Sequence, residues 1–372
     1  MEYKIDFRKV LNIKEISEDI NFWLVRSKSG FFYDEYKNEK YIGLGWNYIT
    51  DKNVTETDDS KVEAIKDEIK RLYKIKQPTT IINKCDRFIN EMKKDDIVMI
   101  PSAHNNKILF AKIGEYFTKD ISVEKENEII SRIDSSEYYG FDEECPYSKR
   151  RHIQIITEVD GSRINPNLYK ALASYHGLSK INKYAEFILR SIYILYIYKN
   201  KLYFVIPIEK KDSINSRTLA EFILNITDIL EYTNEKINVT SKIDLNSPGD
   251  YLSVINNAVE VLSSNCFFGC LTGIVVTICT SKYGPDIMKT ILNFITDFRK
   301  HNLEKSKLEL EKTKVESQLK NEEIDRKLKD VELQEKLLKL SKLTQSLEVN
   351  EPRVSNVINF GELTSNRSNN DK

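Results

Sequence analysis

Residues 93–114 read KKDDIVMIPSAHNNKILFAKIG, and this stretch decides the fold of the first part of the chain. Its two apolar runs, Ile97–Pro101 and Ile108–Gly114, have the composition and length of β-strands. The residues between them, Ala103–Lys107, are mostly polar and are typical of a turn. The stretch therefore predicts two neighbouring strands joined by a short polar loop.

Further strands and helices are predicted on both sides of this hairpin-like stretch. Aromatic and β-branched runs bounded by Gly and Ser predict strands, and they lie over Asn21–Arg26, Tyr41–Trp46 and His152–Val159. Apolar residues at three- and four-residue spacing over Ser60–Tyr73 predict an amphipathic helix. A second short helix is expected over Asp86–Lys93. We therefore expect residues 1–180 to form a first domain with strands and helices.

The second part of the chain, residues 181–262, is predicted to be an α+β domain. Its expected elements are a hairpin within Tyr196–Ile208, a helix over Ser216–Glu231 with Ser216 as N-cap, a strand over Ile237–Leu245 and a helix over Asp250–Leu262. The fold class predicted for the whole chain is therefore α+β.

Three further segments complete the expected organisation. Residues 263–285 contain an apolar helix, and residues 286–347 form a long charged helix with apolar residues at helical spacing. That pattern predicts a coiled coil or docking helix that assembles a homo-oligomer, with a single solvated helix as the alternative. Residues 348–372 are expected to form a disordered tail.

Composition limits the class of protein. The chain has 372 residues, with 57 lysines and arginines against 57 aspartates and glutamates. This balance argues against a histone-like protein that binds polyanions through excess positive charge. The five cysteines lack the paired spacing of a disulfide scaffold or a zinc site. The first residues, MEYKIDFRKV, lack the apolar core of a signal peptide, so we expect a cytoplasmic protein.

Four ordered stretches carry a family resemblance. They are NFWLVRSKSGFFYDEY, YIGLGW, MKKDDIVMIPSAHNNKILFAKIGEY and RRHIQIITEVDGSRINPNLYKAL. Their order resembles the EVE-like branch of the PUA-like superfamily, and one departure is Asp95, where that family usually has Gly. The resemblance implies an N-terminal PUA/EVE-like mixed barrel that recognises modified DNA bases or a nucleotide. It also implies a bacterial anti-phage defence or restriction setting, in which a partner subunit is possible.

Aromatic and polar side chains of this region are the predicted ligand-binding residues. A flipped base is held by stacking and by hydrogen bonds to its edge. The predicted ligand-binding residues are Trp23, Phe32, Trp46, Tyr48, Ser102 and Asn105. Any single ring also fits the alternative of filling the barrel core. His104 is expected to be an ordinary loop residue.

Phosphate contacts would come from local basic residues. The predicted residues are Arg26, Lys28, Lys149, Arg150, Arg151 and Arg163. The alternative for the run Lys149–Arg151 is a solvated charged surface.

Catalytic motifs are weak in this sequence. We find no Walker A loop, no GxSxG elbow and no HExxH pair, and Glu209–Lys211 supplies only half of a restriction-type metal site. We therefore expect non-catalytic recognition, with no cofactor and no metal.

The apolar run 258–280 leaves two alternatives open. Its most apolar part, Phe267–Cys279, has the length of a buried helix or a re-entrant segment, whereas the run stretched to 258–280 approaches the length of a membrane span. A core helix is the first interpretation, and an inner-membrane-associated defence effector is the second. A third hypothesis is a scaffolding protein whose helical tail docks a partner.

Overall fold

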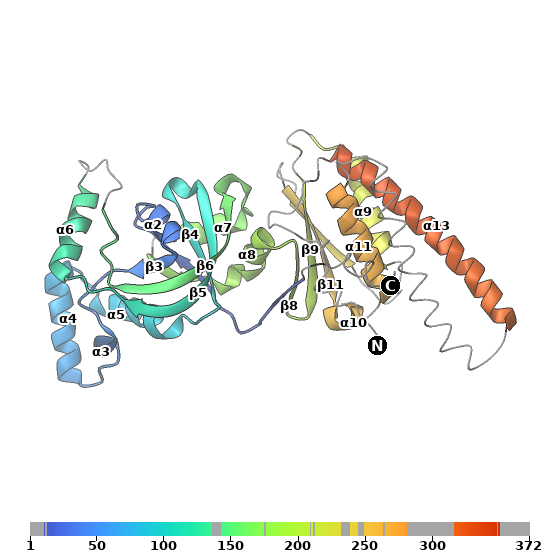
Figure 1. Cartoon of the computed structure of the whole chain (residues 1–372). Helices are drawn as coiled ribbons and strands as arrows, with labels where there is room; N and C mark the ends of the chain where they lie inside the picture. The colour runs from blue at the N-terminus through green and yellow to red at the C-terminus, as the bar shows by residue number, and fades with distance from the viewer. Residues whose placement is uncertain are drawn as a thin grey trace, which may run out of the picture. The chain divides into compact units, whose positions relative to one another are not determined.

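The computed structural model describes two compact units (Figure 1). The described residues are 11, 13–135, 143–174, 176–208, 210, 213–231, 239–244, 249–262, 265–280, 316–347 and 349. The N-terminal unit is Asp19–Ile192, and the C-terminal unit combines Met1–Glu18 with Tyr193–Lys372. Both units mix strands and helices, which confirms the α+β class.

The N-terminal unit is built on a curled sheet that resembles half of a barrel (Figure 1). Its strand order among the described residues is β3-β6-β5-β4-β2-β7. The strands are β2 (Phe22–Val25), β3 (Tyr41–Leu44), β4 (Ile97–Pro101), β5 (Lys107–Thr118), β6 (Lys149–Asp160) and β7 (Leu178–Lys180). β2 and β4 run parallel, and the other neighbouring strands are antiparallel. The carboxyl ends of β2 and β4 therefore lie side by side.

Helical segments connect these strands and complete the core. They are α2 (Tyr33–Asn38), α3 (Asp51–Val54), α4 (Asp59–Tyr73), α5 (Pro78–Asp86), η1 (Arg87–Glu91), η2 (Ala103–Asn105), α6 (Val123–Asp134), η3 (Gly161–Arg163), α7 (Asn167–Leu172), η4 (Asn182–Tyr184) and α8 (Ala185–Ile192). The predicted helix over Ser60–Tyr73 is confirmed as α4. Asp58 caps it by accepting hydrogen bonds from the amides of Ser60 and Lys61. Its buried face, Ile65 and Ile69, joins the core that contains Trp23 and Phe88.

The C-terminal unit is a second sheet packed against helices. Its strand order is β1-β8-β9-β11-β10 among the described residues. The elements are β1 (Lys14–Ile16), β8 (Leu195–Tyr198), β9 (Lys201–Ile208), α9 (Ser216–Glu231), β10 (Val239–Asp244), β11 (Gly249–Asn256), α10 (Ala258–Leu262), α11 (Asn265–Thr280) and α13 (Glu316–Ser346). Helix α13 packs on α9 and α11, and its Leu333, Leu337 and Leu340 are buried in the core of this unit.

The apolar run 258–280 forms α10 and α11 in the C-terminal unit. Phe267, Leu271 and Ile274 of α11 are fully buried in the core cluster. Within the described residues, the structure has no helix that combines the length and the apolar character needed to cross a membrane. In the structure, α11 is therefore a core helix, as the first interpretation of this run predicted.

Three sequence predictions differ from the structure. The predicted helix over Asp250–Leu262 is wrong, because β11 occupies Gly249–Asn256 and only α10 is helical. Ser216 is the first helical residue of α9 and not its N-cap, since the side chain of Asn215 accepts from the amides of Arg217 and Thr218.

The division of the chain is the third difference. The sequence placed a domain boundary at residue 180, whereas the units divide after Glu18 and after Ile192. The reason is a long-range parallel pairing, in which β1 adds to β8 of the C-terminal unit.

The predicted C-terminal segments are described only in part. Residues 316–346 of the predicted helix over 286–347 form α13. Residues 286–315, and residues 350–372 of the predicted tail, lie outside the described residues.

Candidate functional site

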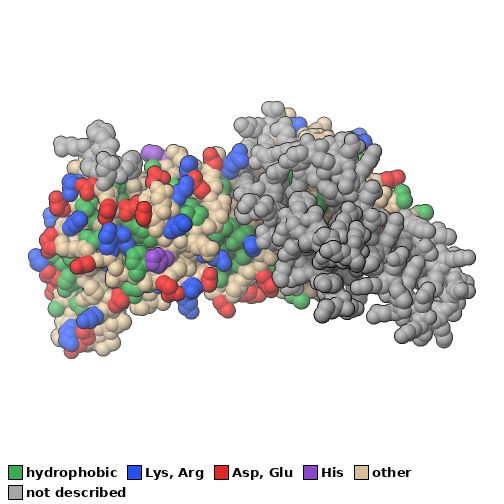
Figure 2. All heavy atoms as spheres, in the orientation of Figure 1, with side chains coloured by type: hydrophobic (Ala, Val, Ile, Leu, Met, Phe, Trp, Pro, Cys, Tyr) green, Lys and Arg blue, Asp and Glu red, His purple; other side chains and the backbone are tan. Residues whose placement is uncertain are grey.

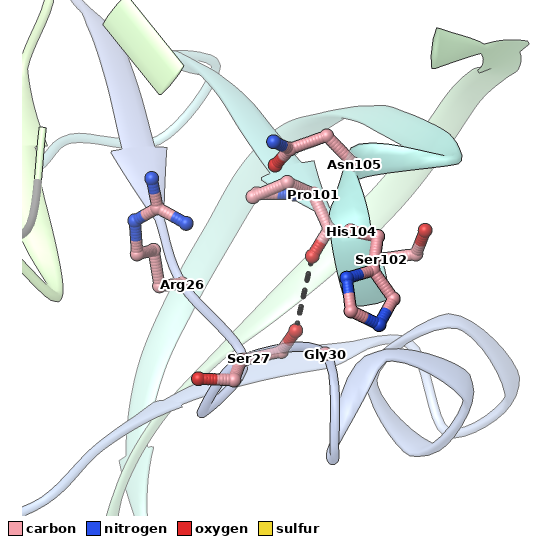
Figure 3. A pocket seen from close by; sticks show the side chains of 8 residues that line it. Arg26, Ser27, Gly30, Pro101, Ser102, His104 and Asn105 are labelled. Carbon is pink, nitrogen blue, oxygen red and sulfur yellow. Dashed lines mark hydrogen bonds between the residues drawn. The ribbon is translucent and has the colours of Figure 1, made fainter. Parts of the chain in front are cut away.

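A cavity of about 310 Å³ lies where the loops after β2 and β4 meet (Figure 3). It is lined by Arg26, Ser27, Ser29, Gly30, Pro101, Ser102, His104 and Asn105. We call it the loop cavity. Loops at the carboxyl ends of neighbouring parallel strands are a common location for ligand sites in α/β sheets. Three predicted site residues, Arg26, Ser102 and Asn105, come together here from two separate segments.

The first loop, Ser27–Gly30, is tied directly to the end of β4. Ser27 is buried, and its Oγ donates a hydrogen bond to the carbonyl of Pro101 at 3.1 Å, which Figure 3 shows as a dashed line. The amide of Phe31 bonds back to the carbonyl of Lys28. Gly30 lies against Ala103, so the two loops are in backbone contact. These contacts fix one side of the loop cavity.

The second loop, Ser102–Asn106, is closed by its own hydrogen bonds. The Ser102 amide donates to the carbonyl of Lys107 at 2.9 Å, and the Lys107 amide donates to Ser102 Oγ at 2.9 Å. The amide of Gly161 donates to the carbonyl of Asn106 at 2.7 Å and so holds the loop from behind. Ser102 was predicted to read a base edge. Its hydroxyl is instead mainly used to shape the loop.

Left-handed backbone is concentrated in the two loops. Among the described residues, eleven non-glycine residues have positive φ, and Lys28, Ser29, His104 and Asn105 are four of them. Such conformations cost free energy in residues with a side chain, and they occur in tight turns and cluster at functional sites. The backbone of both loops is therefore held in conformations that the surrounding contacts must maintain.

Asn105, His104 and Ser29 line the loop cavity, and none of the three side chains makes a hydrogen bond within the described part of the chain. The Asn105 amide has two N–H donors and one carbonyl acceptor. The imidazole of His104 offers a flat ring for stacking as well as a donor or an acceptor nitrogen. The pair can therefore bind a planar, polar ligand.

Arg26 forms a positively charged wall opposite His104 (Figure 3). Its Nε donates to the carbonyl of Ser174 at 2.9 Å, and an Nη donates to the carbonyl of Leu172. These carbonyls lie at the carboxyl end of α7, so the guanidinium is held in a fixed orientation. A fixed guanidinium plane can both stack on a ring and attract an anion.

The predicted aromatic ligand residues do not line the loop cavity. Trp23 has no exposed surface, and its Nε1 donates to Asp96 Oδ2 at 2.8 Å. Phe32 is 1% exposed and packs edge-on against Tyr147. Both belong to the core, which corrects their predicted role. Trp46 and Tyr48 are half-buried and lie outside this cavity.

The predicted basic cluster is also corrected, because its three cations are buried and bound to backbone carbonyls. Lys149 Nζ donates to the carbonyls of Trp46 and Ile49. Arg150 donates to the carbonyls of Tyr147 and Cys145, and Arg151 to those of Phe88, Ile89 and Gly114. Less than a tenth of each side chain is exposed. These residues hold loops in place and are not available to a phosphate.

The other two predicted basic residues lie on the surface. Lys28 makes an ion pair with Asp134 at 2.8 Å. Arg163 is exposed in η3, whose first residue, Gly161, supports the second loop. Sequence reasoning missed Ser27, Ser29, Gly30 and His104 as lining residues. The turn signal Ser27–Gly30 directly after a predicted strand was the available clue.

The described residues contain no group of three or more His, Cys, Asp or Glu side chains that could hold a metal ion.

Comparison with known families matches residues 23–127 to DUF8426, a domain of unknown function. The matched stretch includes both loops of the loop cavity. No curated protein matches the chain.

Proposed function

We propose that the N-terminal unit is a PUA/EVE-like reader that binds a modified base or nucleotide in the loop cavity without catalysis. The observation that supports this proposal best is the Asn105 amide. It faces the cavity without a partner in the described residues, on a loop fixed by Gly30 and Gly161. A preorganised polar group of this kind favours binding, because the loop loses little conformational entropy when the ligand binds.

The size and chemistry of the loop cavity fit a single base. Its volume of about 310 Å³ lies at the lower end of ligand pockets, which are roughly 300–1,000 Å³. An asparagine amide can pair with the donor and acceptor edge of a base. The imidazole of His104 and the guanidinium of Arg26 are both groups on which bases stack. In this proposal they replace the tryptophans that were predicted to stack.

The surface charge fits recognition by a local site. On the face shown in Figure 2, basic and acidic side chains are interspersed over the N-terminal unit. Binding would therefore depend on the loop cavity and would be weak on nucleic acid that lacks the preferred base. The defence or restriction setting follows from the family resemblance and is part of the proposal.

Isothermal titration calorimetry of the full-length protein with nucleosides and their 5′-monophosphates, modified and unmodified, tests the proposal. Asn105→Asp keeps the shape and the tolerance for left-handed backbone but replaces the amide donors with a negative charge. A bidentate contact contributes about 1–3 kcal/mol, so we expect affinity for the preferred ligand to fall by about 5- to 150-fold. Asn106→Asp is the matched control, because it adds the same charge to the next residue, outside the cavity lining.

Failure of every nucleoside and nucleotide to bind would overturn the proposal. Equal losses in Asn105→Asp and Asn106→Asp would also contradict it, because they would show a general charge effect and not loss of a specific contact.

A further inference from the structure

A second cavity of about 520 Å³ lies between α5–η1 and strand β7 of the N-terminal unit. Its lining residues are Thr80, Asn83, Lys84, Arg87, Glu91, His176, Leu178, Ser179 and Lys180. We call it the β7 groove. β7 pairs with β2 on one side and is the last strand of the sheet in the described residues, so the groove follows a sheet edge.

The β7 groove has more cations than carboxylates. Lys180 pairs with Glu91 at 2.7 Å, and Arg87 approaches the same carboxylate at 3.6 Å. Lys84 makes no ion pair within the described part of the chain, and its Nζ lies 5.6 Å from the centre of the Trp46 ring. Partial burial lowers the pKa of the Lys84 ammonium. An anion in the groove would supply the counter-charge that Lys84 lacks there.

The neutral lining residues are also suited to anionic oxygens. Thr80 and Asn83 carry O–H and N–H donors, and the Ser179 hydroxyl, which shares a hydrogen bond with the Ser174 hydroxyl at 3.1 Å, is a third polar group of the lining. Phosphate oxygens are bound in proteins by this mixture of Lys or Arg with hydroxyl and amide donors. Glu91 is the single carboxylate in the lining, and it is already paired with Lys180.

The β7 groove is connected to the loop cavity through the pairing of β7 with β2. Val25 is opposite Leu178, and the amide of Arg26 donates to the carbonyl of Gly177 at 2.9 Å. Gly177 sits between His176 and Leu178, both of which line the groove. From Gly177 to Lys180 is three residues of extended chain, or about 10 Å.

We propose that the β7 groove binds the phosphodiester backbone of a single-stranded nucleic acid whose base occupies the loop cavity. This inference rests on the proposed function for the identity of the base site. The adjacent positions of the two cavities favour one continuous ligand, and the three cations and the hydroxyl and amide donors favour phosphates as its groove-bound part.

Fluorescence anisotropy of the full-length protein with short labelled single-stranded DNA and RNA, over a range of salt concentrations, tests this inference. The double variant Lys84→Ala with Arg87→Ala removes two contacts. Each phosphate contact to a single strand contributes about 0.7 to the slope of log affinity against log salt. We therefore expect a slope shallower by about 1.4 and an affinity at low salt at least about tenfold weaker.

Lys70→Ala with Arg71→Ala is the matched control. It removes the same one lysine and one arginine from the exposed surface of α4, where they form i,i+3 pairs with Asp67 and Glu68. The control is expected to leave the slope and the affinity unchanged. An unchanged slope in the Lys84 and Arg87 variant, or an equal change in the control, would overturn the groove assignment.

Binding of free nucleosides tests the base site independently of the groove, because a nucleoside has no phosphate. The groove variant is expected to keep wild-type affinity for a nucleoside, while Asn105→Asp loses affinity for both nucleoside and oligonucleotide. If nucleosides fail to bind but oligonucleotide binding still depends on Lys84 and Arg87, the base site is wrong and the groove stands. The DNA and RNA arms identify which backbone is preferred, since only RNA carries the 2′-hydroxyl.

Discussion

Gly30 packs so closely on Ala103 that a β-carbon on Gly30 would lie 2.1 Å from the Ala103 amide nitrogen. Gly30 also has φ of +97°, a conformation that residues with a side chain rarely adopt. The contact therefore requires glycine for two independent reasons. It joins the two loops that form the loop cavity.

Gly30→Ala is expected to destabilise the N-terminal unit. The left-handed backbone alone costs about 1–2 kcal/mol for a residue with a β-carbon, and the contact with backbone atoms of Ala103 adds to it. Urea denaturation should therefore show a lower free energy of unfolding. We also expect weaker nucleotide binding in the folded fraction, because the loops must move apart.

Gly177→Ala is the control for this variant. A β-carbon on Gly177 meets no atom within 4 Å, although its carbonyl accepts from Arg26 of the same site. Its stability should stay near that of the wild type or rise slightly, since alanine reduces the entropy of the unfolded chain. Similar losses in both variants would show that the Gly30–Ala103 contact is not the cause.

Glu126 gives the N-terminal unit a specific pH dependence. Its carboxylate accepts from the amides of Trp46 at 2.5 Å and Asn47 at 2.7 Å, and from the Tyr73 hydroxyl at 3.0 Å. Burial raises the pKa of Glu126 above its ordinary value of 4.5, against the lowering effect of these donors. The folded protein therefore binds this proton more tightly than the unfolded chain.

The sign of the effect follows from linkage. The Glu126 contribution to stability is greatest below pH 4.5 and declines as pH rises through the raised pKa. Glu126→Gln has no proton to titrate, so the free energy of unfolding should decline less with pH in that window. The absolute stability should fall, because the amide nitrogen cannot accept from the backbone donors. Glu128→Gln, at an exposed site on the same helix, should keep the wild-type pH profile.

Local sequence patterns correctly predicted the helices that bury one face and expose the other. Helix α4 and helix α9 have one apolar stripe each, and their predicted ranges match the structure to within one residue. Strand β11 was predicted as a helix because it pairs on both sides and is buried along Tyr251–Ile255. A continuous apolar run does not distinguish a central strand from a buried helix.

Only the part of the loop cavity that depends on local sequence was predicted. Asn105 follows a strand in an evident turn, so its loop was identified from local sequence. The partnership of Ser27 with Pro101 joins residues 74 positions apart through the parallel pairing of β2 with β4, and no local pattern reports it. The aromatic density near Trp23 had two possible causes, core packing and stacking, and only the tertiary fold separates them.

Lys149 provides the last prediction, since a basic residue in a charged run was expected on the surface. Lys149→Met keeps the unbranched apolar stem of the side chain but leaves the carbonyls of Trp46 and Ile49 without their donor. An unsatisfied buried polar group costs about 1–3 kcal/mol, so urea denaturation should show a loss of about that size. The salt dependence of oligonucleotide binding by the folded protein should not change, because Lys149 does not reach solvent. Lys52→Met, at an exposed position in α3, should leave stability unchanged. A shallower salt slope at wild-type stability for Lys149→Met would instead assign Lys149 to phosphate binding.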